Sequence, residues 1–377
     1  MPLRLANRTK GRRWALVSAV AAVLVAVPLV VAALPAGASA DPGRLRALIA
    51  ASARQPYQGY AESRGSLGLP DLPKLADVTK LFTGTTQLRA WYSSPDSYRV
   101  DVLTTSGERD LTRTADSEYS WDYGANTLTQ FLGEPPVRLP RAADLLPPEL
   151  ARRLLAAAPG DRVDALPARR VAGVEAAGIR LTPADPDTTV GRIDVWADPG
   201  TGVAVQVELT AKGQTAPVLT TSFEELAQTQ PDVLAEPPRP APGSGFAVAK
   251  APDVTAALGA LGRAPLPSSL AGKPLRTTAL GGVQGAGLYG TGLASFVVLA
   301  IPRDLANGAS DAAAKGGARS VQLPGGTAVA LAIPPLSLMV VNSTVSRRSY
   351  LLAGLVTPAS LETAGRALAV LRRGGGR

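Results

Sequence analysis

Three glycines, Gly285, Gly287 and Gly290, have the GxGxxG spacing of a loop that binds the pyrophosphate of a dinucleotide. In such a site the loop follows a strand and opens a helix, whose N-terminus faces the phosphates. Here the glycines lead instead into the run Leu293-Ala294-Ser295-Phe296-Val297-Val298, which predicts a strand. A glycine-rich hairpin turn is therefore the preferred interpretation, and we expect no cofactor.

The sequence contains few residues that could bind a metal ion or act as a nucleophile. The chain contains no His and no Cys, which excludes Ser-His-Asp triads, Cys-His pairs and metal sites built from imidazole or thiolate. Asp185-Pro186-Asp187 could begin an oxygen-ligand site, but no further acids follow at loop spacing, so a solvated turn is preferred and we expect no metal. Hydrolysis by paired carboxylates stays open in principle. Because no such pair can be named, the sequence favours a protein that is not an enzyme.

A second kind of candidate site comes from apolar residues that alternate with polar ones, since one face of a strand then becomes apolar. If a sheet of such strands curls, that face lines a cavity that can take a ligand. The aromatic set Trp91, Tyr119, Trp121, Tyr123 and Trp196 fits either a core or such a lining. The candidate lining residues are Leu88, Val100, Val102, Tyr119, Trp121, Leu146, Leu150, Leu154, Val205 and Val207.

The N-terminal forty residues predict export. Five basic residues precede an uncharged apolar run from Trp14 to Leu34, and Ala38-Ser39-Ala40 is a pattern that signal peptidases cut. The run would reach ~31 Å as a helix, enough to span a bilayer, so residues 1–40 are either a cleaved signal peptide or a membrane anchor. We therefore expect an extracytoplasmic protein of the cell envelope, membrane-anchored or secreted.

The formal charge of +9 does not point to nucleic acid. Five of the 39 Lys and Arg residues and none of the 30 acids lie before Asp41, so the rest of the chain carries a scattered excess of only four positive charges.

The elements expected after Asp41 divide into two domains, both α+β. Period-two patterns follow Tyr57, with examples at Leu88–Tyr92, Tyr98–Val102 and Tyr119–Tyr123, and they resume between Gly178 and Phe223. Residues 41–230 therefore predict a long antiparallel sheet, curled into an unclosed half-barrel and joined by short turns.

Helical segments are expected to cover this sheet only in part. Arg44 to Gln55 predicts a short helix, and the stretch from Leu145 to Ala158 predicts another that acts either as a lid or as part of the core. The apolar stretch from Leu67 to Leu75 is broken by two prolines and predicts a mobile flap or a packed loop.

The proline-rich residues 231–252 predict a stiff linker. Beyond it, residues 253–377 predict a small α+β domain with strands near Phe296, Ala328, Ser337 and Tyr350. Thr357-Pro358 is expected to cap a final helix.

Two segments in the second domain carry a resemblance to a known family: Tyr289-Gly290-Thr291-Gly292-Leu293-Ala294-Ser295-Phe296, and the run from Tyr350 to Leu361. Together with Thr85 to Asp122 and Gly191 to Trp196, they make the chain similar to the MucB/RseB-type regulators of the sigma-E response. The larger domain of that family resembles the lipoprotein carrier LolA and the mycobacterial LppX/LprG proteins. The chain departs from it at Thr291, where the regulators usually carry an acid, and at the insertion from Leu67 to Gly84.

The resemblance implies a non-enzymatic protein that holds a lipid or an acylated protein under helical lids, as a carrier or an envelope sensor. It thereby assigns lipid binding to the ten candidate lining residues named above. It also implies an alternative, a regulator that binds an anti-sigma factor or another membrane protein. Neighbouring genes for a sigma factor and its anti-sigma factor would favour regulation, and neighbouring transporter genes would favour carriage.

Overall fold

The computed structural model describes residues 37–69, 76–104, 107–135, 137–232, 236–240, 242–261, 264–276, 279–280 and 282–372. The expected signal or anchor lies almost wholly outside these residues. Within them, no helix has both the length and the apolar character needed to cross a membrane.

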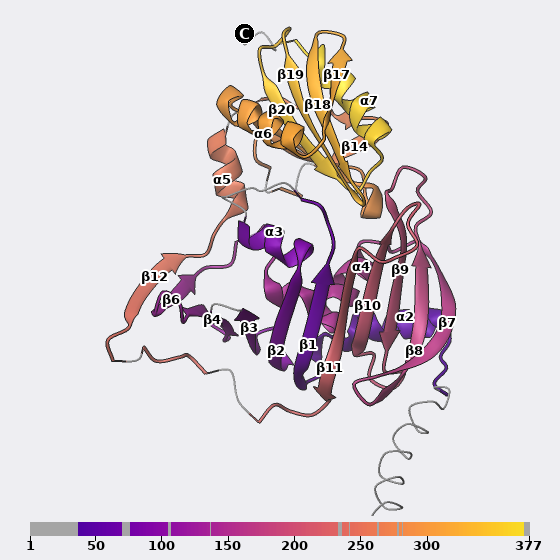
Figure 1. Cartoon of the computed structure of the whole chain (residues 1–377), viewed down its shortest axis with the longest axis vertical. Coiled ribbons are helices and arrows are strands. Elements are labelled where there is room, and N and C mark those ends of the chain that lie inside the picture. Colours follow the sequence, from indigo (N-terminus) through magenta and orange to yellow (C-terminus); the bar gives the residue numbers. More distant parts are fainter. Residues whose placement is uncertain are drawn as a thin grey trace, which may run out of the picture.

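A twelve-stranded sheet dominates the N-terminal part, in the order β12-β6-β5-β4-β3-β2-β1-β11-β10-β9-β8-β7. Figure 1 shows it strongly curled and open at both edges. Its strands are β1 (Tyr57–Gly65), β2 (Thr85–Ser94), β3 (Ser97–Thr104), β4 (Gly107–Arg113), β5 (Glu118–Asp122), β6 (Thr127–Leu132), β7 (Arg162–Val171), β8 (Val174–Thr182), β9 (Val190–Ala197), β10 (Ala204–Ala211), β11 (Leu219–Ala227) and β12 (Gly245–Lys250).

The helices of this part are α2 (Pro42–Ala51), α3 (Ala76–Thr83) and α4 (Pro147–Ala156), with the short 3-10 turns η1 (Ser52–Arg54) and η3 (Ala142–Leu145). Asp41 fixes the start of α2, because its carboxylate accepts a hydrogen bond from the Arg44 amide at 2.8 Å and Pro42 follows in the first turn. The helices expected near Arg44 and Leu145 are therefore present. The prolines between Leu67 and Leu75 precede α3, a helix that the sequence did not predict.

Antiparallel pairing holds between neighbouring strands throughout this sheet with one exception. Strand β12 lies inside the range predicted as a linker, and it pairs in parallel with β6, Phe246 opposite Leu128. The sheet is therefore mixed rather than purely antiparallel. Apolar alternation alone did not reveal β12, because its side chains are almost all exposed and no face of it is buried.

Helices fill only half of the concave face. Helices α2 and α4 pack their Leu45, Ile49 and Leu155 against Ile179, Ile193 and other residues of β8 to β10. Over β1, β2 and β3, a second core surrounds Tyr57, Leu88 and Phe223 and includes Leu81 of α3. Over β4 to β6, this face borders a cavity instead.

The C-terminal part is an antiparallel eight-stranded sheet in the order β13-β14-β15-β16-β20-β19-β18-β17. Its elements are α5 (Val254–Leu261), β13 (Ser269–Leu270), β14 (Lys273–Arg276), β15 (Ala286–Tyr289), η4 (Gly292–Ala294), β16 (Phe296–Ile301), α6 (Arg303–Lys315), β17 (Arg319–Leu323), β18 (Gly326–Ile333), β19 (Leu336–Ser343), β20 (Ser349–Gly354) and α7 (Pro358–Ala369). As expected, Thr357 caps α7 by accepting a hydrogen bond from the Ser360 amide.

The two parts meet at Thr188, in the loop before β9. The Thr188 hydroxyl is buried and donates to the Leu293 carbonyl at 2.7 Å, and the Thr189 amide donates to the Leu355 carbonyl at 3.0 Å. The Thr357 amide returns a bond of 2.7 Å to the Asp187 carbonyl. Backbone hydrogen bonds therefore join the two sheets directly.

Candidate functional site

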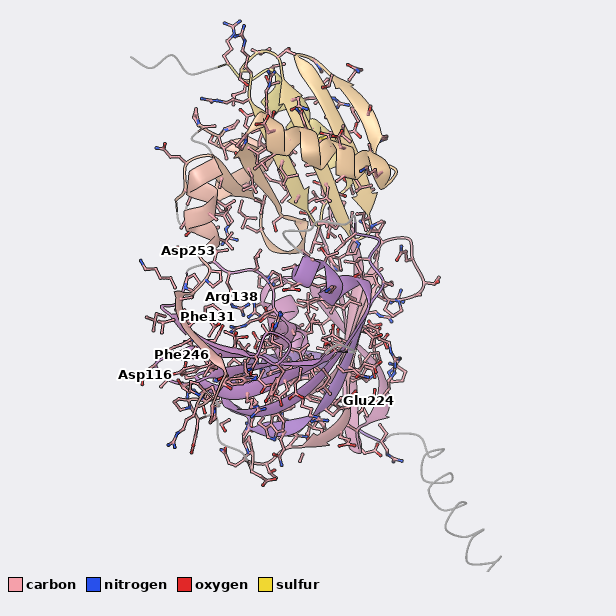
Figure 2. The ribbon with its side chains drawn as sticks, turned by 60° about the vertical axis from the view of Figure 1, so that its left-hand side comes forward. Asp116, Phe131, Arg138, Glu224, Phe246 and Asp253 are labelled. Atoms are coloured by element: carbon pink, nitrogen blue, oxygen red, sulfur yellow. The ribbon has the colours of Figure 1, made fainter. Side chains whose placement is uncertain are left out.

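A cavity of 1380 Å³ lies on the concave face, where the helices leave β4 to β6 uncovered. Its walls are α3, the strands β2 to β6 and the segment from Gly133 to Ala143, and the residues just after β12 complete them. In Figure 2, the wall residues Phe131 and Arg138 lie between Asp253 and Phe246. The volume exceeds the ~300–1,000 Å³ typical of small-molecule pockets.

The apolar part of the wall comes from three sources. The strands contribute alternate residues of one face, α3 contributes one side, and the segment after β6 contributes an exposed leucine that is 44 % accessible. Alternation places them together because every second side chain of a strand points the same way. These residues are Val78, Leu81, Val100, Val102, Leu111, Phe131 and Leu139.

Charged side chains in the wall are joined to one another across the strands. Arg109 of β4 donates to Asp122 of β5 at 2.8 Å and reaches Asp77 of α3 at 3.3 Å. Arg141 forms a close ion pair with Glu118 and donates to the Tyr98 hydroxyl at 2.7 Å. Because opposite charges are matched locally, these groups do not demand a charged ligand.

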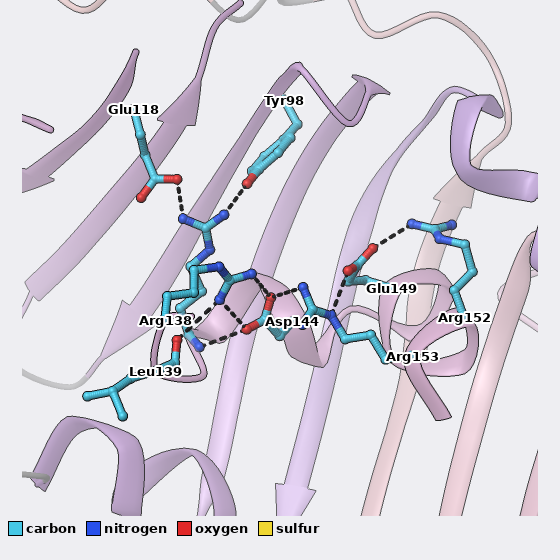
Figure 3. Close-up of polar contacts among 9 residues, drawn as sticks. Tyr98, Glu118, Arg138, Leu139, Asp144, Glu149, Arg152 and Arg153 are labelled. Carbon is cyan, nitrogen blue, oxygen red and sulfur yellow. Dashed lines mark hydrogen bonds and ion pairs between the residues drawn. The ribbon is translucent and has the colours of Figure 1, made fainter. Parts of the chain in front are cut away.

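The segment from Arg138 to Arg141 is held against the sheet by Asp144 (Figure 3). Arg138 donates two hydrogen bonds of 2.7 Å to the Asp144 carboxylate, the Arg141 amide donates at 3.0 Å, and Arg153 of α4 lies 3.1 Å away. Burial alone would raise the pKa of Asp144, but the bonds and charge of Arg138 outweigh it, so that pKa is lowered. This wall of the cavity is thus fixed by a carboxylate that stays ionised.

Of the residues assigned to lipid binding, the structure brings Val100 and Val102 to the cavity wall. Leu88 and Leu146 lie in the core next to it. Leu154 and Val207 belong to the core under α2 and α4, and Leu150 contacts both cores. Contact of a ligand with Val100, Val102 or any other of these residues stays a prediction.

Tyr119, Trp121 and Val205 point away from the cavity. In β5 the wall residues are Glu118, Ser120 and Asp122, so the alternate aromatic side chains lie on the outer face. Val205 packs against Trp196 on the outer face of β10, where the Arg169 guanidinium stacks 3.6 Å above the Trp196 ring. The aromatic set is therefore not the lining of this cavity.

Several wall residues were not identified from the sequence. Val78 and Leu81 belong to α3, whose short pattern was hidden behind two prolines, and Leu139 lies in a loop without periodicity. Phe131 could have been assigned to a strand, because the run from Thr127 to Leu132 has the length of a short strand. The arginines of the wall could not be assigned without the pairing register of β4 and β5.

The other motifs have structural roles. The interpretation of Gly285 to Gly290 as a hairpin turn is wrong, because Ala286–Tyr289 forms strand β15 and the turn to β16 follows it through η4. The strand expected from Leu293 to Val298 begins only at Phe296. Asp185 and Asp187 lie in a turn, as predicted, but their carboxylates bind Lys273 of the C-terminal sheet at 3.0 and 3.4 Å. They contribute to the junction between the two parts.

An acidic group lies on the outer face of β3 and β4, where carboxylate oxygens of Asp101, Glu108 and Asp110 come within 4.8 Å of one another. Arg99 lies between two of them, 2.7 Å from Asp101 and 2.8 Å from Asp110. Burial, with the charge of Asp101 second, raises the pKa of Asp110 to about 7. The Arg99 guanidinium between two of these carboxylates thus explains why the acidic side chains lie close together.

Comparison with known proteins gives likenesses of fold. No family model matches the sequence, and no curated protein matches it. Among solved structures, MucB in complex with the periplasmic part of MucA is 15 % identical, with 89 % of this chain and 100 % of that chain covered and a TM-score of 0.45. The MucA/MucB complex of Pseudomonas aeruginosa is 15 % identical, covering 86 % and 97 % at a TM-score of 0.46.

A LolA superfamily protein of Nitrosomonas europaea is 8 % identical over 51 % of this chain and 94 % of its own, with a TM-score of 0.22. The expected resemblance to MucB and to LolA-like proteins is thus found as structural similarity at low identity. Similarity of this degree describes the course of the chain and carries no argument about ligand or activity.

Proposed function

We propose that this protein is a non-enzymatic cell-envelope protein that binds a lipid, or the acyl chain of a lipidated protein, in the cavity on the concave face. The observation that carries the proposal is the cavity itself, 1380 Å³ in volume, with apolar residues of β3, β4, β6 and α3 in its wall. A carrier and an envelope sensor both need such a container.

The energetics of acyl transfer fit a container of this kind. Each methylene that leaves water gains about 0.8 kcal/mol, so ten buried methylenes gain about 8 kcal/mol. A net binding free energy of that size corresponds to a Kd of roughly 1 μM. Apolar recognition is nondirectional, so chain burial alone can hold the ligand while the paired charges of the wall stay satisfied.

Native mass spectrometry of residues 41–377, purified from a membrane-containing host, tests the proposal by looking for co-purified lipid. Binding of a fluorescent fatty acid to the delipidated protein gives the affinity. A lipid-free mass together with no fatty-acid binding would refute the proposal.

A matched pair of leucines tests the location. Leu139 lines the cavity and Leu132 does not, while their exposed fractions are 44 % and 46 %. Leu139→Asp should weaken fatty-acid binding at least about tenfold, since a carboxylate beside an acyl chain costs more than 1.4 kcal/mol. Leu132→Asp should leave the Kd unchanged. Equal effects of the two substitutions would place the ligand elsewhere.

The second candidate function is a regulator that binds an anti-sigma factor, as MucB binds MucA in the structures above. One feature of this chain favours it: Leu67 and Leu69, from the N-terminal part, pack on a cluster of the C-terminal domain, which gives the cavity a physical link to a second domain. The test is binding of the mature chain to the extracytoplasmic domain of an anti-sigma factor encoded beside its gene. Unchanged affinity with and without fatty acid would argue against lipid-controlled regulation.

A further inference from the structure

The connection between β1 and β2, residues 66–84, touches both the cavity and the C-terminal domain. At its start, Leu67 and Leu69 are half-buried against a small apolar cluster of Ala313, Leu331 and Ile333. At its end, helix α3 lines the cavity with Val78 and Leu81. Two described pieces of this connection, one before residue 70 and one after residue 75, therefore contact places that belong to different sheets.

The two ends of this connection are bonded to each other. The Leu67 amide donates to the Phe82 carbonyl at 2.9 Å, and the Gly65 amide donates to the Gly84 carbonyl at 2.8 Å. These bonds continue the β1–β2 ladder beyond Arg64 and Thr85. A displacement of the C-terminal turn of α3 therefore pulls on Leu67 through the backbone.

Gly65 permits this close pairing. A Cβ atom built on Gly65 would lie 2.4 Å from the backbone carbonyl carbon and oxygen of Phe82, nearer than any side chain can approach. The strand entering the connection and the residues leaving α3 thus pack backbone to backbone, and they move as one unit.

The hold on α3 from the cavity side is weak. Its ion pair with the sheet joins Asp77 and Arg109 at 3.3 Å, and the Asp77 side chain is 76 % exposed. An exposed pair of this kind contributes little. Arg109 keeps its shorter bond to Asp122 when Asp77 leaves. What remains is the packing of Val78, Leu81 and Phe82, which an acyl chain in the cavity would compete for.

We infer that Leu67 and Leu69 couple occupancy of the cavity to the C-terminal domain: a ligand that displaces α3 withdraws these leucines from the cluster of Ala313, Leu331 and Ile333. The apolar surface that this movement exposes accepts two leucines separated by one residue. A partner segment that replaces Leu67 and Leu69 would therefore carry two apolar side chains at the same spacing. This inference rests on the proposed lipid site and names its regulation.

Pulsed EPR distances between two introduced cysteines test the coupling, because the native chain has no Cys. Ser66→Cys and Ala332→Cys replace exposed residues on either side of the contact. Oleate should shift this distance distribution to longer values. The control pair, Glu224→Cys with Ala332→Cys, joins exposed sites of the two sheets outside the connection, and it should not change.

A second arm needs no ligand. Leu81→Asp puts a carboxylate into the core beneath α3 and should lengthen the Ser66–Ala332 distance in the absence of lipid, with Leu81→Ala as the milder variant should the first fail to fold. If oleate fails to bind the wild-type chain, the lipid site is wrong and this arm still decides the coupling. If oleate binds and neither arm moves the pair, or if both pairs move equally, the coupling is wrong.

Discussion

Single carboxylates fix the geometry of the cavity wall, and Asp144 is the clearest case. It is 8 % exposed, receives hydrogen bonds from the Arg138 side chain and the Arg141 amide, and forms an ion pair with Arg153. No ligand contact is needed to explain this residue. Its role is to hold Leu139 and Arg141, which do line the cavity.

Asp144→Ala should therefore lower the free energy of unfolding by about 2–3 kcal/mol at pH 7, because it leaves charged donors without their acceptor. The folded pKa of Asp144 is depressed, so its contribution is present above the unfolded value near 4 and is lost as the pH falls through the folded value. Urea unfolding at pH 7 and pH 3 should show a smaller deficit at pH 3 than at pH 7. A deficit of the same size at both pH values would mean that packing, not charge, is lost.

Asp110 should behave in the opposite way, since burial raises its pKa to about 7. Its contribution to stability is full below the unfolded value near 4 and is lost as the pH rises through 7. Asp110→Asn removes this titration. The melting temperature of the variant minus that of the wild type should therefore increase as the pH rises from 5 to 8. A constant difference across that range would contradict the raised pKa.

At the scale of elements, the strands with one buried face were predictable and the exposed or interrupted ones were not. The patterns at Leu88–Tyr92 and Tyr98–Val102 correspond to β2 and β3, whose alternate residues are buried. Strand β12 has no buried face, and α6 has mostly small side chains in place of an apolar stripe. Which strands meet depends on long-range pairing, so the cavity wall between β3 and β6 could not be read from local patterns.

For helix α4 the sequence left two roles open, a lid or part of the core, and the contacts of Leu150 favour the core. Leu150 contacts both cores of the N-terminal part and does not border the cavity. Leu150→Asp should lower the melting temperature strongly, because an unpaired carboxylate there costs several kcal/mol. Ala156→Asp, at an exposed position of the same helix, should cost under about 1 kcal/mol. A normal melting temperature of Leu150→Asp with lost lipid binding would restore α4 as a lid.

At the scale of the whole molecule, two sheets behave as one body only if their junction resists separation. The junction consists of hydrogen bonds around Thr188, of Lys273 between Asp185 and Asp187, and of Leu293 and Leu355 packed on the core under α2 and α4. The sequence predicted two α+β parts, but this junction was not predictable from it, because the hydrogen bonds of the junction link residues that are 88 or more positions apart.

Thr188→Val tests whether this junction holds the parts together. Valine keeps the shape of threonine but removes the hydroxyl that donates to Leu293 and accepts from the Val190 amide, leaving buried polar groups unpaired at a cost of about 1–3 kcal/mol. We expect the wild type to unfold in a single calorimetric transition. Because the loss falls on contacts between the sheets, Thr188→Val should broaden that transition or split it in two. Thr188→Ser retains the hydroxyl and should keep one transition. If Thr188→Val lowers the melting temperature but leaves a single transition, the residue stabilises its own loop and the two parts are coupled through other contacts, with Leu67 and Leu69 the next to substitute.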